Sequence, residues 1–177
     1  MPDIAMHLLD IVYNSIRALA KRITISIHDS EKENIIEIIV EDDGCGMDEE
    51  TIQHVMDPFF TTRTTRKVGL GVPLFKEGVL ATGGTFDIRS AVNKGTTIKG
   101  CYVKQHWDTP PLGDLAETLA TLIQADDQID YLFTYTSDTH QFCLDTKEIK
   151  AILEGVKINE PEIILWLKDY IKEGLSQ

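Results

Sequence analysis

Three side chains near the start of the sequence have types and spacing suited to a metal-bound phosphate: Asp10, Asn14 and Arg17. On a predicted first helix they share an arc of about 80° with His7 and Lys21, at 100° per residue. Mg²⁺ prefers one or two protein oxygens together with water and phosphate oxygens, which a carboxylate and an amide can supply. The two cations at the end of the stripe could meet phosphate. The alternative is a solvated helix face of ordinary charged residues.

A second group of candidates is the loop Asp42-Asp43-Gly44-Cys45-Gly46-Met47, which follows a predicted buried strand. A carboxylate at a strand end can accept a hydrogen bond from an exocyclic amine, and glycines let a flat ring approach the backbone closely. The alternatives are a tight acidic turn or a calcium loop. The EF-hand pattern is excluded because its ligand spacing and its closing Glu are missing.

A third candidate is Gly69-Leu70-Gly71, which precedes a predicted helix. Its amides and the N-terminus of that helix could receive phosphate oxygens. Residues 61–67 just upstream concentrate hydroxyls and cations in an otherwise acidic chain. The segment matches neither the Walker pattern nor a dinucleotide fingerprint, and the alternative is a solvated loop.

Seven predicted elements position these candidates, in the order helix, strand, strand, helix, helix, strand, strand. They are a helix over residues 3–21, strands 23–28 and 35–40, a short helix that begins at residues 48–50, a helix over 73–81, and strands 85–90 and 96–103. This order predicts an α+β fold, with one mixed sheet and its helices on a single face.

After this first domain, residues 1–106, the sequence predicts a linker over residues 107–113 and a C-terminal α+β extension over residues 114–177. The extension has helix 112–124, strands 129–135 and 141–144, a helix that ends near Gly155, and a final helix with Pro161 in its first turn. That final helix is apolar around much of its circumference and needs a partner. Its partner could be the extension's own hairpin, or the extension could pack on the main sheet.

Composition limits the function. The 177 residues are 42% hydrophobic and carry a net charge of −12, which argues against nucleic-acid binding. Residues 111–177 hold 13 acids against 5 bases, so a protein partner could dock on this acidic extension. No run of residues resembles a signal peptide or a membrane span. The three cysteines lack zinc spacing and are predicted to be buried, reduced thiols in a cytoplasmic protein.

Taken together, the motifs resemble the GHKL ATPases, a family that includes histidine kinases, gyrase, the large heat-shock chaperones and MutL. Residues 10–18 resemble the family's asparagine box, and residues 42–47 its first glycine box. Residues 57–63 resemble the phenylalanine box of the kinase branch, and residues 69–71 the second glycine box. The resemblance covers about residues 2–103. It implies the two-layer α/β sandwich called the Bergerat fold, with ATP and Mg²⁺ as cofactors.

The resemblance also implies a role for each matching residue. Asn14 would coordinate Mg²⁺ and Arg17 would touch phosphate. Asp42 would accept from the adenine amine with support from Thr96, and Asp10 would be the catalytic base. The remaining implied nucleotide contacts, which include a lid over the triphosphate, are Gly44, Gly46, Met47, Phe60, Thr61, Thr62, Arg63, Arg66, Lys67, Gly69, Leu70 and Gly71.

The chain departs from the family pattern at several points. Asp10 stands where relatives usually carry Glu, and Lys67 where many kinases have a glycine. The strand that usually leads the fold is not predicted, and neither is a helix pair with a phosphoacceptor histidine. We therefore expect a kinase-like ATPase module that phosphorylates a separate protein. The alternatives are a non-enzymatic, ATP-gated regulatory module and a slow ATP hydrolase.

Overall fold

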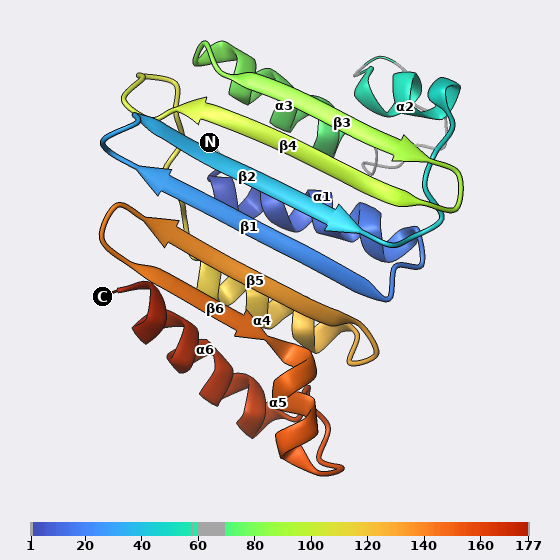
Figure 1. Ribbon diagram of the computed structural model, residues 1–177, viewed down its shortest axis with the longest axis vertical. Coiled ribbons are helices and arrows are strands. Elements are labelled where there is room, and N and C mark those ends of the chain that lie inside the picture. Colours follow the sequence, from blue (N-terminus) through green and yellow to red (C-terminus); the bar gives the residue numbers. More distant parts are fainter. Residues whose placement is uncertain (1, 58, 60–69, 177) are drawn as a thin grey trace.

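The computed structural model describes residues 2–57, 59 and 70–176 (Figure 1). The helices are α1 (Ile4–Arg17), α2 (Glu49–Met56), α3 (Gly71–Ala81), α4 (Leu115–Ala125), α5 (Thr146–Leu153) and α6 (Pro161–Leu175). The strands are β1 (Arg22–Ser30), β2 (Ile35–Asp42), β3 (Thr85–Ala91), β4 (Gly95–Val103), β5 (Asp130–Ser137) and β6 (Gln141–Asp145). The order of the first seven elements is the predicted one.

All six strands form one sheet in the order β3-β4-β2-β1-β5-β6. Neighbouring strands are antiparallel except β1 and β5, which are parallel, so the sheet is mixed. Figure 1 shows α1, α3 and α4 behind this sheet, and among the described elements no helix crosses its near face. The predicted fold class, an α+β sandwich with a mixed sheet and helices on one face, is confirmed.

The core lies between the sheet and α1, α3 and α4. In β1 the isoleucines Ile23, Ile25 and Ile27 are each at most 2% exposed, whereas the residues between them face the open side of the sheet. This alternation is the strand pattern that the sequence predicts. From α1, Leu8 and Ile11 reach the same core and are each 1% exposed. The buried apolar surface fixes the helix relative to the strands that form the candidate site.

The first helix is shorter than predicted, since it ends at Arg17 and not at Lys21. Leu19 adopts a left-handed backbone with φ of 62°, which ends the helix. The carbonyl of Ala18 accepts a 2.9 Å hydrogen bond from the Cys45 amide, far along the chain. Lys21 therefore precedes β1 and is not part of the charged helix stripe.

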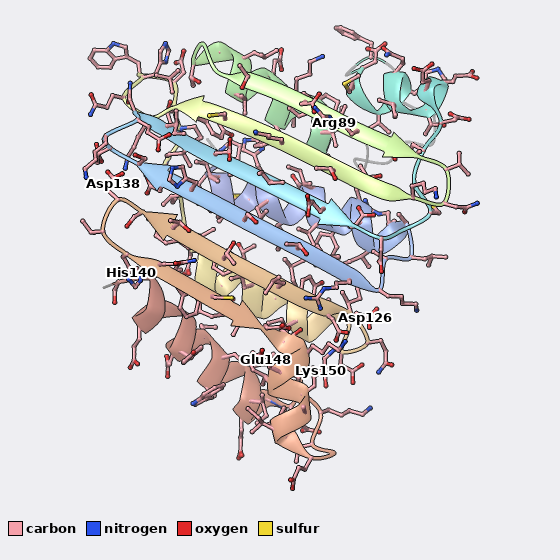
Figure 2. The ribbon with its side chains drawn as sticks, viewed as in Figure 1. Arg89, Asp126, Asp138, His140, Glu148 and Lys150 are labelled. Carbon is pink, nitrogen blue, oxygen red and sulfur yellow. The ribbon has the colours of Figure 1, made fainter. Side chains whose placement is uncertain are left out.

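The chain after residue 106 contributes two strands to the same sheet. β5 pairs with β1 from Arg22 opposite Asp130 to Asp29 opposite Ser137. In the β5–β6 turn, Asp138 accepts a 2.5 Å hydrogen bond from the Ser30 hydroxyl and two more from backbone amides of the β1–β2 turn (Figure 2). The C-terminal strands are thus tied to β1 along its length and at its end.

An ion-pair network reinforces this junction. Lys104, just after β4, contacts Asp29 at 2.5 Å and Glu31 at 2.7 Å. Burial disfavours its charge, but these two carboxylates outweigh burial and raise the pKa of Lys104 to about 12. The Tyr135 hydroxyl of β5 donates to the other oxygen of Asp29 at 2.9 Å. One buried carboxylate therefore joins β1, β5 and the segment after β4.

Two expectations from composition concern the whole chain. The cysteines are free thiols, but the prediction that they are buried is wrong, because Cys45 and Cys143 are exposed and Cys101 is half-buried. Cys101 is in β4, Cys143 is in β6, and Cys45 is in the loop over residues 42–47, which we call the glycine loop. Within the described ranges, no helix is both long and apolar enough to cross a membrane.

Candidate nucleotide site

A cavity of about 210 Å³ opens between α1, the end of β2, the start of β4 and helices α2 and α3. Most of the side chains in its wall are apolar, which suits the faces of a flat ring. The wall consists of Ile11, Asn14, Ser15, Ala18, Asp42, Cys45, Gly46, Met47, Val55, Val72, Thr96 and Ile98. Five predicted contacts, Asn14, Asp42, Gly46, Met47 and Thr96, are thus brought together.

Among the residues that the structure describes, Asp42 is the only carboxylate in that wall. Its Oδ2 accepts a 2.6 Å hydrogen bond from the Ser15 hydroxyl of α1, and its Oδ1 accepts a 2.8 Å bond from the Gly44 amide. These two bonds fix the carboxylate at the end of β2. Because an ionised carboxylate has about four acceptor positions, both oxygens can still accept a hydrogen bond from a ligand amine.

Three strands place polar residues beside that carboxylate. Thr96 of β4 lies opposite Asp42 of β2 on one side and opposite Ser90 of β3 on the other. The hydroxyls of Ser90 and Thr96 are 2.8 Å apart. The Ser90 hydroxyl also accepts a 2.8 Å hydrogen bond from the Met47 amide, which ties the glycine loop to the β3–β4 hairpin. The site is therefore held by hydrogen bonds from both of its sides.

Gly46 occupies a position that other residues could not adopt without strain. Its φ is +67°, and a Cβ atom there would lie 1.9 Å from the Ala91 carbonyl oxygen. Gly44 is also confined, because a Cβ atom would lie 2.7 Å from the Ala18 carbonyl oxygen. The glycine loop can therefore pass close to both α1 and the β3–β4 hairpin.

Asp43 anchors the same loop to the start of β1. Its Oδ1 accepts hydrogen bonds from the amides of Lys21 at 2.7 Å and Arg22 at 2.9 Å. Burial alone would raise the pKa of the Asp43 carboxyl, but these amides outweigh it and lower the pKa below its usual value of 3.8. Asp42 thus lies in the cavity wall, whereas Asp43 accepts hydrogen bonds from backbone amides.

The charged stripe of α1 is divided between the cavity and its surroundings. Asn14 lies in the cavity wall, and its Oδ1 accepts a 2.9 Å hydrogen bond from Arg17 Nη1. Asp10 is exposed one turn earlier, where a Cβ on Gly71 would lie 2.9 Å from its Cβ. His7 is buried against Phe75, and burial lowers its pKa although the Asp10 and Asp3 carboxylates oppose this. Asp10 therefore borders the N-terminus of α3, Asn14 lies in the cavity wall, and His7 packs further along α3.

The donor set suits a phosphate-bound Mg²⁺ and not an all-protein metal cage. Within the part of the chain that the structure describes, no group of three or more His, Cys, Asp or Glu could hold a metal ion. Mg²⁺ needs only one or two protein oxygens when phosphate and water supply the others, and the Asn14 amide oxygen can be one of them.

Seven of the predicted nucleotide contacts lie outside the described residues: Phe60, Thr61, Thr62, Arg63, Arg66, Lys67 and Gly69. Leu70 and Gly71, which follow them, are described. Leu70 is 37% exposed and precedes the first residue of α3, which is Gly71. Neither residue is in the cavity wall.

Sequence reasoning gave no role to one hydroxyl of the site, that of Ser15, which follows Asn14 in the asparagine box. Ser15 is a small polar residue on an otherwise apolar helix face, which is the signal that could have identified it. The thiol of Cys45, also in the cavity wall, carried no such signal.

The fold is similar to that of a solved protein domain. The chain superposes on the Aquifex aeolicus MutL ATPase domain complexed with ADP with a TM-score of 0.53 and 13% identity. The superposition covers 87% of this chain and 69% of that one. It therefore extends into the C-terminal part of the sheet.

Sequence comparison defines the family. The sequence model of the histidine kinase-, DNA gyrase B-, and HSP90-like ATPases matches residues 3–105, so the chain belongs to this family. It is 34% identical over 96 residues to the sensor histidine kinase YvrG of Bacillus subtilis and 32% identical over 97 residues to the sensor histidine kinase ZraS of Escherichia coli. These matches cover 52% and 54% of this chain but only 17% and 21% of those kinases.

Proposed function

We propose that this chain binds ATP with Mg²⁺ in the cavity between α1 and the β2 and β4 strands, and phosphorylates a separate protein. The observation that carries the proposal is the Asp42 carboxylate, held by Ser15 and Gly44 in a mostly apolar wall. Such a carboxylate can select adenine by accepting from its exocyclic amine. Gly46 and Met47 would line the base, and Thr96 would support Asp42.

The other end of the nucleotide would meet α1 and the N-terminus of α3. Asn14 would hold Mg²⁺ through its amide oxygen. Arg17, which donates to that oxygen in the structure, would turn to a phosphate when the metal occupies the oxygen. We propose that Thr61, Thr62, Arg63, Arg66 and Lys67, which lie outside the described residues, belong to a lid that contacts the triphosphate. Phe60, Gly69, Leu70 and Gly71 are the further proposed nucleotide contacts of this region.

The proposed catalytic residue is Asp10, which borders the start of α3. Bound Mg·ATP supplies the γ-phosphoryl group, and transfer depends mainly on positioning and on charge neutralisation. Asp10 would accept the proton of the attacking group.

The placement of the histidines supports an acceptor that lies outside these 177 residues. All five histidines lie in the described part of the chain, and none is in the cavity wall. His7 is buried between α1 and α3, and His28 pairs with Glu33 on β1 and its turn. The acidic C-terminal extension, residues 114–177, is the proposed place for the partner to dock.

The test is incubation of the chain with γ-labelled ATP, Mg²⁺ and cell extract. We expect a labelled partner protein, with acid-stable label on Ser or Thr and acid-labile label on His. At an ATP concentration below saturation, the label should fall by about tenfold or more with Asp42→Asn. It should persist with Glu41→Gln, a neighbouring exposed acid outside the cavity wall.

Two outcomes would overturn phosphate transfer. If nucleotide binds and changes the affinity for the partner, but neither labelled protein nor free phosphate forms, the function would be a non-enzymatic switch. If phosphate is released without a labelled protein, and Asp10→Asn abolishes this release, the function would be slow ATP hydrolysis.

A further inference from the structure

Helix α6 leaves large apolar side chains on its outer side. Its inner side is fully packed, with Ile164, Leu167 and Ile171 at most 7% exposed. In contrast, Leu165 is 61% exposed and Trp166 is 52% exposed. The helix therefore buries one apolar stripe within the fold and leaves a second apolar surface without a partner among the described residues.

Acidic residues lie between Leu165 and the two aromatic residues on this outer side. Six residues fall within an arc of about 140° at 100° per residue. These six residues, which we call the α6 outer face, are Glu162, Leu165, Trp166, Asp169, Tyr170 and Glu173. The helix's two internal lysines, Lys168 and Lys172, fall outside the arc, and Lys168 is paired with Glu117 of α4 at 2.7 Å. The face thus carries apolar surface and negative charge without a cation of its own.

The aromatic part of the face is anchored to the core. Trp166 and Tyr170 are stacked, with ring centroids 5.2 Å apart and planes at 13°. Tyr170 in turn packs against Phe142 of β6, with ring centroids 5.6 Å apart, and Phe142 is 8% exposed. Gly174 allows this close approach, because a Cβ atom there would lie 2.2 Å from the Phe142 ring. Rings held in this way lose little conformational freedom when a partner binds.

We propose that the α6 outer face docks a basic, amphipathic segment of a partner protein. Stacked aromatic rings beside carboxylates attract Arg and Lys side chains, because the ring faces favour cations and the carboxylates pair with them. Leu165 adds apolar area for the partner's own apolar stripe. A second copy of this chain fits poorly, since the chain has a net charge of −12 and would oppose like charges.

This surface lies apart from the nucleotide cavity. Figure 1 shows α6 beside the β6 edge of the sheet, whereas the cavity is formed by α1, α2, α3, β2 and β4. The inference rests on the proposed use of a separate protein partner, but its test measures binding and not phosphate transfer. Loss of docking with intact ATP binding, or the reverse, therefore distinguishes failure of one proposal from failure of the other.

The chain offers a built-in reporter for the test. It has two tryptophans, and Trp107 is 99% exposed on the segment after β4. A Trp107→Phe variant leaves Trp166 as the only tryptophan. Its fluorescence is titrated with a synthetic amphipathic helical peptide made of Leu and Arg, and with a matched peptide in which Glu replaces every Arg. We expect a saturable change with the Arg peptide and none with the Glu peptide.

Variants of the face identify the contacts. Replacing Glu162 and Glu173 together by Lys should weaken binding of the Arg peptide by about tenfold or more. A control variant with Glu41→Lys and Glu77→Lys makes the same change in net charge at positions away from α6 and should bind as the parent does. Separate calorimetric titration of Tyr170→Ala should show a similar weakening to the Glu162 and Glu173 variant.

The proposal is overturned by either of two results. One is equal binding of the Arg peptide to the face variant and to the control variant, which would mean unspecific attraction to an acidic protein. The other is self-association of the parent chain in sedimentation experiments that the face variant abolishes, which would assign the surface to a second copy. Unfolding curves of each variant guard against a loss of structure, and none of the substituted positions is buried.

Discussion

The Ser15 hydroxyl donates a 2.6 Å hydrogen bond to Oδ2 of Asp42, and so joins α1 to the end of β2. The two residues are 27 positions apart in the chain. Because Ser15 is buried and Asp42 lies in the cavity wall, this bond sets the direction in which the carboxylate faces. The helix that presents Asn14 therefore also orients the proposed adenine acceptor.

Replacement of Ser15 by Ala should weaken ATP binding by about three- to tenfold, because the Asp42 carboxylate loses one of its two fixed donors. Isothermal titration calorimetry measures the effect. Ser26→Ala on β1 is the matched control, since Ser26 faces the open side of the sheet and should leave affinity unchanged. Equal affinity of the Ser15 variant and the parent would show that the bond does not orient Asp42.

Replacement of Gly46 by Ala should reduce the free energy of unfolding by about 2 kcal/mol or more, through backbone strain and overlap with the Ala91 carbonyl. Gly155→Ala is the control, because Gly155 also has a positive φ but a Cβ atom there would have no neighbour within 4 Å. Its cost should be about 1 kcal/mol, from backbone strain alone. Urea unfolding compares them, and equal costs would contradict the close approach at Gly46.

Replacement of Asn14 by Ala should remove the dependence of ATP binding on Mg²⁺, since its amide oxygen is the proposed metal ligand in the cavity wall. Calorimetric titration with Mg²⁺ and with excess chelator measures the dependence. Tyr13→Phe, on the same helix but outside the cavity wall, should keep it. Full retention of the Mg²⁺ effect in the Asn14 variant would refute the metal assignment.

The Asp138 contact predicts a pH dependence of stability. The hydrogen bond from Ser30 and those from the Lys32 and Glu31 amides outweigh desolvation and lower the pKa of Asp138 below 3.8. A lowered folded-state pKa contributes stability that is present above about pH 3.8 and is lost as the pH falls through the folded-state value. Asp138→Asn should therefore be less stable than the parent at pH 7.

The difference in free energy of unfolding between the parent and Asp138→Asn should become smaller below pH 3.8. Unfolding curves from acidic to neutral pH measure this difference. Asp127→Asn, in the turn between α4 and β5, is a control for loss of one acidic charge elsewhere. A gap between parent and Asp138→Asn that stays constant with pH would contradict the contribution of the ionised carboxylate.

Local sequence patterns predict most of the fold but not its long-range contacts. The alternation of Ile23, Ile25 and Ile27 predicts β1, because side chains of a strand alternate between two faces. Local pattern placed the end of α1 four residues too late, because it did not indicate the left-handed backbone of Leu19 or the hydrogen bond from the distant Cys45 amide to Ala18. The parallel pairing of β5 with β1 likewise depends on contacts over more than 100 residues.

The same distinction applies to the candidate site. Residue type and box spacing predicted Asn14, Asp42 and Gly46 as site residues, and all three lie in the cavity wall. Their proposed roles depend on functional groups that the sequence displays. The sequence shows Ser15 as a polar residue on an apolar helix face, but its hydrogen-bond partner, Asp42 of β2, is apparent only when α1 lies against β2. The packed structure therefore determines which group accepts the hydrogen bond of the Ser15 hydroxyl.

Calorimetric titration of the parent chain and of Asp42→Asn with Mg·ATP tests the central claim most directly. Glu41→Gln is the control for loss of an acid, because it is the neighbouring exposed residue outside the cavity wall. We predict saturable binding to the parent and the control, and binding weaker by about tenfold or more to Asp42→Asn. Absence of binding to the parent, or equal binding to all three proteins, would contradict ATP recognition by this cavity.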